Sequence, residues 1–477
     1  MKKLLLLSSF SLLFFSCKEE AEPSKPNIIY ILADDLGYGD LGCYGQKIIR
    51  TPNIDQLARD GILFTDHYAG SSVCAPSRAA LMLGQHTGNN RVRGNYETGP
   101  MGFGACLELR DEDVTIAEVL KTQGYTNGVV GKWGMGMNGT TGEPNKQGFD
   151  YSYGYLNQGH AHNQFPAFLF KNGERFELAE NQNRATKSFS NDLFTKEAVR
   201  FLDETKEKPF FLYMAYTTPH AEMLLPASDI FNSYKGVVDE EAYKNKKKPD
   251  STDGNAVAYR SQEFPAAAYA AQITHLDSCV GVLVQKLKDL GLENNTMIMF
   301  TSDNGPHSEG GANPKYFQSS GSLKGKKRDL YEGGIRVPFL VKWPNVIEPN
   351  TVSNHISAFW DMFPTFADAA GATFSPVDGL SLISTLKGNK ESQKNHDFLY
   401  WEFHENPTTN QAVRKGNWKA VRMDPDGEVE LFDLSKDIGE TKNVADIHPD
   451  ILTEMTNLLN NIRTPHEIWK MRGSQSE

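Results

Sequence analysis

The sequence has little cysteine and too little positive charge to balance its acidic residues. Five cysteines in 477 residues are too few for a disulfide framework, so we expect Cys43, Cys106 and Cys279 to be buried thiols with at most one pair among them. The net charge of −11 argues against nonspecific nucleic-acid binding, and an anionic ligand would need positive charge gathered locally. There is no internal repeat, which excludes repeat architectures.

The N-terminus has the pattern of a targeting segment. Two lysines precede the apolar run Leu4–Phe15, which is too short to span a bilayer as a helix, and Cys17 and a polar stretch follow. This arrangement resembles a bacterial lipoprotein signal. The resemblance implies a signal peptide over residues 1–16, a lipidated tether over 17–25 that starts at Cys17, and a Gram-negative outer membrane, at its periplasmic face or the cell surface. Membrane contact would be through the lipid alone. An ordinary secretory signal is the alternative, and both imply export.

Strands and helices alternate over residues 26–388. Continuous apolar runs such as Ile28–Ala33 and Met297–Phe300 predict strands that are buried on both faces. Pro265–Leu290 has the apolar stripe of a long helix. The alternation predicts an α/β fold with a large, mostly parallel sheet sandwiched by helices.

The composition changes after Gly388. Short alternating segments at 398–403, 411–413, 419–423 and 430–433 predict a small antiparallel sheet. A terminal helix is expected from Pro449 to Asn461. Residues 389–477 therefore form a predicted α+β C-terminal subdomain, separate from the α/β domain of residues 26–388.

The segment around Cys74 is typical of a loop that enters a helix. Pro76 suits the first helical turn, so Cys74 lies at a helix N-terminus, where free N–H groups favour an anion. Arg78 adds a permanent positive charge one turn later. The segment is compatible with a nucleophile beside an anion site and equally with an inert buried thiol.

Two of the predicted strands end in oxygen-bearing side chains. Asp34 and Asp35 follow the first strand, and Asp303 and Asn304 follow a later one. Ligands of open α/β sheets bind at the carboxyl ends of strands, so we expect these four side chains to converge. Carboxylate and amide oxygens select Ca²⁺ or Mg²⁺ over a soft metal.

Basic residues and a histidine follow other strands. Lys132 and His220 each come directly after a predicted strand, and Lys324 lies in a basic, glycine-rich loop. Together with Arg78 they are expected to surround the same point. A cation and several positive groups mark a site for a tetrahedral oxyanion, which leaves phosphate and sulfate esters open.

The cysteine segment resembles the signature of a known family. Cys74-Ala75-Pro76-Ser77-Arg78 is similar to the motif of type I, formylglycine-dependent sulfatases in the alkaline phosphatase-like superfamily. The resemblance runs from Asn27 to about Ala445. It includes Asp34-Asp35, Gly131-Lys132-Trp133, Thr218-Pro219-His220, Ser302-Asp303-Asn304-Gly305 and Lys324.

The resemblance implies a chemistry for these residues. Cys74 would be oxidised to formylglycine by a formylglycine-generating or an anaerobic sulfatase-maturing enzyme, and its hydrate would attack sulfur. Position 74, together with Asp34, Asp35, Asp303 and Asn304, would hold Ca²⁺, with Mg²⁺ as an alternative. Arg78, Lys132 and Lys324 would stabilise the sulfuryl charge, and His220, with Lys324, would protonate the leaving oxygen.

One position departs from the family pattern. Many members have a histidine two residues after the lysine, where this sequence has Gly134. That histidine assists the formylglycine, so its absence leaves a role unfilled. We hypothesise that His160 or His162 supplies the replacement imidazole.

The loop with these two histidines is similar to that of bacterial carbohydrate sulfatases. The resemblance implies a sulfated saccharide substrate with galactose or N-acetylgalactosamine units. Candidate sugar contacts are His160, His162, Arg91, Arg93, Asn95 and His404. Two other functions stay open: a phosphomonoesterase or phosphonate hydrolase of the same superfamily, and a non-catalytic glycan-binding lipoprotein.

Overall fold

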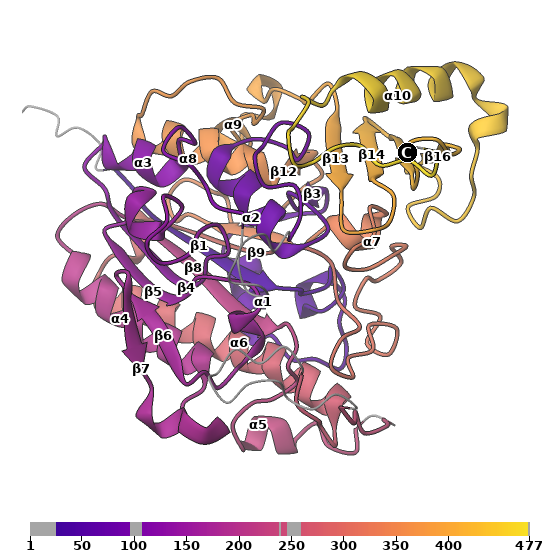
Figure 1. Cartoon of the computed structure of the whole chain (residues 1–477). Helices are drawn as coiled ribbons and strands as arrows, with labels where there is room; N and C mark the ends of the chain where they lie inside the picture. The colour runs from indigo at the N-terminus through magenta and orange to yellow at the C-terminus, as the bar shows by residue number, and fades with distance from the viewer. Residues whose placement is uncertain (1–24, 96–106, 238–239, 246–258, 476–477) are drawn as a thin grey trace, which may run out of the picture.

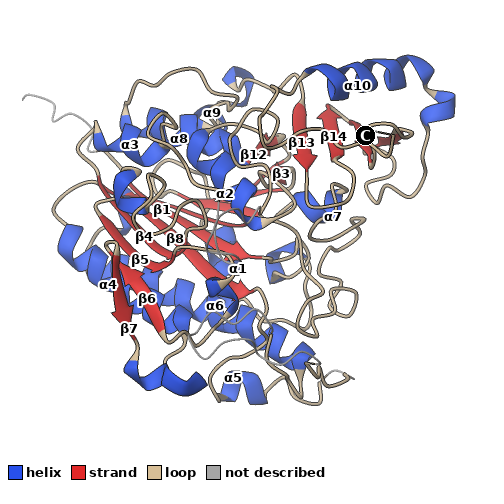
Figure 2. Ribbon diagram, viewed as in Figure 1, coloured by secondary structure: helices blue, strands red, loops and turns tan. Residues whose placement is uncertain are grey.

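A ten-stranded mixed sheet forms the centre of the molecule (Figure 2). It is seen in a computed structural model that describes residues 25–95, 107–237, 240–245 and 259–475. The predicted signal peptide, Cys17, nearly all of the tether and Cys106 lie outside these residues. The strand order is β11-β2-β10-β9-β1-β8-β4-β5-β6-β7. The strands are β1 Asn27–Asp34, β2 Ile62–Phe64, β4 Thr126–Lys132, β5 Tyr151–Tyr155, β6 Phe168–Lys171, β7 Glu174–Glu177, β8 Phe210–Pro219, β9 Thr296–Ser302, β10 Phe339–Lys342 and β11 Thr351–Ser353.

The middle of this sheet is parallel. Strand β1 pairs in parallel with both β8 and β9, and β4 pairs in parallel with β8 and β5. Antiparallel pairs are confined to β10 and to the hairpin strands β6 and β7. The carboxyl ends of five adjacent strands therefore lie at one edge, as the α/β prediction requires.

Helices cover both faces of the sheet (Figure 1). In β1, Ile29 and Ile31 pack into one apolar core, whereas Ile28, Tyr30 and Leu32 pack into the other. This alternation follows from the two-residue period of a strand, and burial on both faces explains why the run is apolar throughout. One core contains residues of α1 Pro52–Arg59, α4 Ser190–Thr205 and α6 Pro265–Asp289, and the other contains residues of α2 Cys74–Leu83, α3 Ile116–Lys121 and α8 Met362–Ala370.

Shorter elements complete the large domain. These are the two-stranded sheet of β3 His67–Tyr68 and β12 Ser357–Ala358, and the single-turn helices α5 Asp229–Asn232, α7 Glu332–Ile335 and α9 Ile383–Leu386. Helix α3 begins with a capping box, in which the side chains of Thr115 and Glu118 each accept from the other's backbone N–H.

A four-stranded antiparallel sheet forms the C-terminal part (Figure 1, orange to yellow). Its strands are β13 Leu399–Phe403, β14 Asn410–Lys415, β15 Trp418–Arg422 and β16 Glu430–Asp433, and α10 Pro449–Asn461 packs against it. The predicted small sheet and terminal helix are confirmed to within a few residues. The opposite face of the sheet shares a core with the large domain, in which Trp401 packs with Tyr68 and Trp360.

The described cysteines are free thiols: Cys43, Cys74 and Cys279. Cys43 is half-buried rather than buried, because it lies in the short helix Gly42–Tyr44 near the surface, where its N–H bonds Asp55. Among the described residues, none of the helices has the length and apolarity needed to cross a bilayer.

Candidate active site

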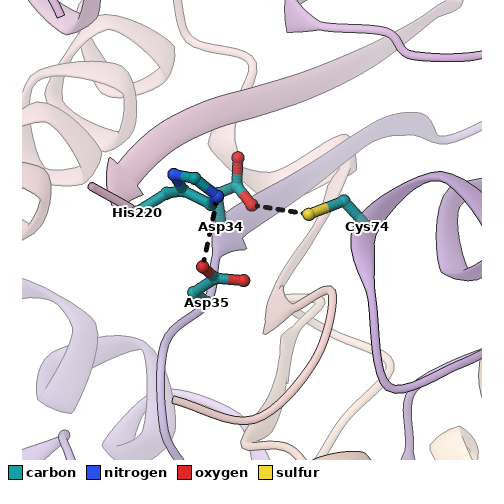
Figure 3. Close-up of side chains that lie close together, drawn as sticks. All are labelled: Asp34, Asp35, Cys74 and His220. Carbon is teal, nitrogen blue, oxygen red and sulfur yellow. Dashed lines mark hydrogen bonds and ion pairs between the residues drawn. The ribbon is translucent and has the colours of Figure 1, made fainter. Parts of the chain in front are cut away.

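Cys74 is the first residue of α2 and is 1% exposed. Its Sγ lies 3.3 Å from an oxygen of Asp34 (Figure 3). The next N–H, that of Ala75, donates to the side-chain oxygen of Asn95 at 2.9 Å, which satisfies one free donor of the helix N-terminus. Burial and then the charge of Asp34 raise the pKa of the Cys74 thiol well above its usual value. The unmodified side chain is thus a neutral thiol, a poor nucleophile.

Four oxygen-bearing side chains meet beside Cys74. Asp34 ends β1, Asp35 follows in a left-handed conformation with φ of 64°, and Asp303 and Asn304 follow β9. The N–H of Asp35 donates to Asp303 at 3.1 Å, and the amide of Asn304 donates to Asp35 at 2.7 Å. All four residues are fully buried. The convergence expected at this sheet edge is confirmed.

This set fits a hard divalent cation. Asn304 Oδ1 is buried and has no hydrogen-bond partner, so an acceptor at the centre of the cluster is left unused. Burial and then the nearby charge of Asp34 raise the pKa of Asp303 to about 7, and a cation bound among these carboxylates would favour its ionised form. Carboxylate and amide oxygens suit Ca²⁺ or Mg²⁺.

Three buried cations face the three carboxylates. Arg78 lies 2.7 Å from Asp303, Lys132 lies 2.7 Å from Asp34, and Lys327 lies 2.8 Å from Asp35. These six charges balance when Asp303 is ionised. A divalent cation added among them would leave the cluster positive, which favours an anion such as a sulfate ester against the negative net charge of the chain.

His220 follows β8 and faces the same cluster (Figure 3). Its Nδ1 lies 2.5 Å from the carbonyl oxygen of Ala221, whereas Nε2 lies 3.5 Å from Asp35. Burial, together with the positive charge of Lys327, lowers the pKa of His220 to about 4. With Nδ1 bonded to the backbone, Nε2 is the nitrogen that can exchange a proton in the site.

The prediction that Lys324 of the basic loop lies in the site is wrong. Lys324 is 38% exposed, and its ammonium lies 3.7 Å from the ring centre of Tyr331 and 4.0 Å from Glu430, against the C-terminal sheet. Lys327 occupies the buried position instead. Both lysines belong to the stretch 324–328, which also contains Lys326 and Arg328, and sequence alone does not show which of these four cations points inward.

A cavity of about 440 Å³ opens onto the cluster. Residues of the large domain and of the C-terminal part line it: Cys74, Asn95, Gln158, His162, His220, Tyr259, Glu309, Lys327, Arg328, His404, Glu405, Trp469 and Arg472. A larger cavity of about 730 Å³ lies elsewhere, within the loop 308–329, and none of the clustered residues line it. The chemistry of the cluster identifies the smaller cavity as the candidate active site.

Three of the six predicted sugar contacts line this cavity, namely Asn95, His162 and His404. Arg93 does not, because it is buried against Glu402 at 2.9 Å and Thr464 O at 3.1 Å. Arg91 turns away and donates to the carbonyl of Glu108 at 2.8 Å. The predictions for both arginines are wrong, since their charges are used in holding loops together.

The two histidines near the Gly134 gap differ in position. The ring of His160 packs against Tyr155 and Phe168, at centroid distances of 4.9 and 4.3 Å, and does not line the cavity. The two predictions for His160, that it contacts the sugar and that it replaces the missing imidazole, are therefore wrong. His162 stacks on His220 at 4.8 Å, and its buried Nδ1 has no hydrogen-bond partner. Its proposed role remains a prediction.

Several cavity residues were not predicted. Tyr259, Glu309 and Arg328 come from loops, and Glu405, Trp469 and Arg472 come from the C-terminal part. No motif marks them, because they meet the cluster only through the packing of distant segments. Gln158 is different, because it belongs to the polar run from Gln158 to Asn163 beside a strand end. That pattern could have indicated Gln158 as a site residue.

Comparisons with known proteins agree with this geometry. The sequence model of the family described as "Sulfatase" matches residues 26–372, and that described as "N-sulphoglucosamine sulphohydrolase, C-terminal" matches residues 325–465. Human "Arylsulfatase A" is 32% identical over 91% of this chain and 87% of its own length. An "N-acetylgalactosamine-6-O-sulfatase" of Bacteroides thetaiotaomicron is 28% identical over 92% of this chain and 93% of its own.

A solved structure shows the same architecture. The crystal structure of "Ps i-CgsB" superimposes with a TM-score of 0.76 at 31% identity, over 92% of this chain and 93% of that one. A second crystal structure of that protein is described as a complex with k-i-k-neocarrahexaose.

Proposed function

The chain belongs to the sulfatase family, whose members hydrolyse sulfate esters, and from this premise we propose that its substrate is a sulfated carbohydrate. One observation carries the proposal: the buried cluster of oxygens and cations lies at the base of a cavity with polar and aromatic walls. Histidine, arginine, glutamate and tryptophan side chains in one wall suit a sugar better than a purely apolar ligand. The relatives that act on N-acetylgalactosamine sulfate or bind a carrahexaose support a galactose-type unit.

We propose that the oxygen cluster holds Ca²⁺, with Mg²⁺ as the alternative, and that Cys74 is the precursor of formylglycine. Asp34, Asp35, Asp303 and Asn304 would supply the oxygen ligands, and position 74 would complete the set. When bound, the metal supplies Lewis-acid polarisation, and the hydrated aldehyde supplies a hydroxyl nucleophile. The neutral thiol at position 74 supports the need for such a conversion.

The remaining charged residues of the cluster then have distinct roles. Arg78, Lys132 and Lys327 would hold the sulfate oxygens and stabilise the charge that grows on them during the reaction. They are already fixed by the carboxylates, so little reorganisation is needed. His220 Nε2 would first have to take up a proton, which the negative charge of a bound sulfate group favours, and would then pass it to the leaving sugar oxygen. The Nδ1 contact to the Ala221 carbonyl keeps the ring oriented.

We also propose an exported, lipid-anchored enzyme. The support is the N-terminal pattern, with two lysines, a short apolar run and Cys17. Export would place the enzyme where sulfated polysaccharides occur. A formylglycine-generating or anaerobic sulfatase-maturing enzyme would be its partner before or during export.

A screen of defined monosulfated saccharides tests the proposal. Purified enzyme is incubated with galactose and N-acetylgalactosamine sulfates, glucosamine sulfates and an aryl sulfate, and released sulfate is measured. On the same sample, a tryptic peptide containing position 74 should weigh about 18 Da less than the cysteine form. Matching phosphate and phosphonate esters form a separate arm.

Sulfate release from a galactose-type saccharide by the converted enzyme is expected. Release only from the aryl sulfate would contradict the carbohydrate assignment. Preferential turnover of phosphate or phosphonate esters would favour the superfamily alternative. Saccharide binding without sulfate release by the converted protein would identify a glycan-binding protein.

A further inference from the structure

The side chain of Gln158 has an unusual environment for a buried amide. It is 8% exposed, and neither Oε1 nor Nε2 has a hydrogen-bond partner in the structure. A buried carboxamide with no partner for its donor or its acceptor costs free energy, so it requires an explanation. Gln158 lines the same cavity as Cys74 and His220, which points to a ligand as the missing partner.

The backbone fixes the position of this amide. The N–H of Trp133 donates to Tyr155 O at 2.9 Å, and that of Gly134 donates to Leu156 O at 3.0 Å, so the chain before Gln158 continues the β4–β5 pairing. The residues on either side of Gln158 are also joined, because the N–H of His160 donates to Oδ1 of Asn157 at 2.7 Å. The loop is held on both sides, and Gln158 is not a freely moving surface residue.

The amide occupies the space beside Gly134. A Cβ built on Gly134 would lie 2.0 Å from Nε2 of Gln158, which is well inside contact distance. Gly134 also has φ of +84°, which a side chain would make costly. The missing side chain at position 134 and the buried amide of Gln158 are therefore two parts of one arrangement. Only Trp133 separates Gly134 in the chain from Lys132, whose ammonium lies 2.7 Å from Asp34.

The free groups of the amide match a sulfated sugar. Sulfate oxygens only accept hydrogen bonds, and sugar hydroxyls can donate them. Nε2 is a donor and Oε1 an acceptor, so one carboxamide can bind a sulfate oxygen and a neighbouring hydroxyl together. It also adds no charge to a cluster whose charges already balance.

We propose that Gln158 is a substrate-binding residue, which donates from Nε2 to a sulfate-group oxygen and accepts at Oε1 from a hydroxyl of the sulfated sugar. The inference rests on the proposed function for the identity of the sugar. His162 is a separate group, with its ring stacked on His220. Gln158, rather than an imidazole, fills the space over Gly134.

Binding measurements without turnover test this assignment. The mature chain carries Cys74→Ala, which prevents conversion, and titration calorimetry measures the affinity for inorganic sulfate and for galactose 6-sulfate. In this background, Gln158→Leu should weaken sulfate binding by about 10- to 100-fold, the usual effect of losing a hydrogen bond to a charged group. Gln158→Glu should weaken it further, because a carboxylate repels the anion.

Stability separates a ligand contact from a structural role. Gln158→Leu breaks no hydrogen bond within the protein, so its Tm should be unchanged or higher. The matched control is Gln147→Leu, which removes amide bonds to Thr141 O at 3.0 Å and Arg110 O at 3.4 Å outside the cavity. That variant should have a lower Tm and the parental sulfate affinity.

Gly134→Ala supplies an independent test of the geometry. Its methyl group should displace the amide and weaken sulfate binding when Gln158 is present, but should add no further loss in Gln158→Ala. Parental sulfate affinity in Gln158→Leu, or a parent that binds no sulfate, would overturn the proposal. Failure of the matured enzyme to act on any saccharide would instead overturn the proposed function, since sulfate binding is measured without turnover.

Discussion

The base and the rim of the candidate active site are built in different ways. The base consists mainly of Asp34, Asp35, Lys132, His220, Asp303 and Asn304, which follow or end parallel strands. Cys74 and Arg78 from the start of α2 and Lys327 from the loop 308–329 complete it. The rim consists of Asn95, Arg328, His404, Glu405, Trp469 and Arg472, which come from loops and from the C-terminal part. Sheet topology fixes the base, whereas packing between distant segments places the rim. The base therefore suits the chemistry common to the family, and under the proposed function the rim would select the sugar.

The largest effect is expected at the centre of the base. Cys74→Ala should lower sulfate release by more than about 10⁴-fold, since it removes the precursor of the proposed nucleophile. Circular dichroism and Tm should stay near those of the parent, because alanine fits within the space of the cysteine side chain. Cys43→Ala, which changes a half-buried thiol outside the cavity, should retain activity. Substantial turnover by the Cys74→Ala variant would mean that position 74 is not the nucleophile.

The second test compares two lysines of one loop, only one of which reaches the base. Lys327→Ala should reduce kcat by about 10²- to 10³-fold, because it removes a preorganised positive charge 2.8 Å from Asp35. Lys324→Ala should change kcat by less than about twofold, since its ammonium lies on the ring of Tyr331 and outside the cavity. Steady-state kinetics with an aryl sulfate give both values. The opposite ranking would restore Lys324 to the site and remove Lys327 from it.

The contrast between base and rim also explains what the sequence could predict. Apolar runs fix the strands, and residues directly after a parallel strand share one sheet edge, so the positions of Asp34 and Asn304 follow from pattern alone. Helix α10 spans Pro449–Asn461 as predicted, because its N-terminal proline and apolar stripe are local signals.

The failures have a common physical cause. Lys324 and Lys327 are three residues apart in an irregular loop, where no period relates sequence to direction. Arg93 resembles an anion-binding residue in sequence, but Glu402, 309 positions later, neutralises it. The contribution of Trp469 depends on the docking of the C-terminal part, which no local pattern reports. Tertiary contacts over long separations decided each of these cases.

A smaller effect is expected at the rim. Arg472 is exposed, lines the cavity and is held by the carbonyl of Asn406 at 2.9 Å. Arg472→Ala should raise KM for a sulfated saccharide by about 2- to 10-fold, the range for one hydrogen bond, and leave the kinetics of an aryl sulfate unchanged. Arg175→Ala, at an exposed ion pair on β7, is the control and should change neither substrate. Equal losses with both substrates would show that Arg472 acts on the base rather than on the sugar.

The smallest effect on sulfate release, and the clearest effect on stability, is expected behind the rim. Glu402 contacts Arg93 at 2.9 Å, His404 at 2.8 Å and Arg463 at 2.8 Å. Burial alone would raise the pKa of Glu402, but these partners lower it to about 2. The folded state therefore favours the ionised carboxylate. Its contribution to stability is present above the ordinary glutamate pKa of about 4.5 and is lost as the pH falls toward 2.

Glu402→Gln should destabilise the protein by about 3–5 kcal/mol at neutral pH, because it leaves buried cations unpaired. The difference in unfolding free energy between the parent and Glu402→Gln should shrink between pH 4.5 and the acid limit of folding. The control is Glu204→Gln, at an exposed ion pair with Arg200, which should cost less than about 1 kcal/mol at any pH. Since Glu402 holds His404 and Arg93 but does not line the cavity, kcat on an aryl sulfate should change little. A variant whose stability deficit is independent of pH would show that hydrogen bonding, and not the charge of Glu402, supports the rim.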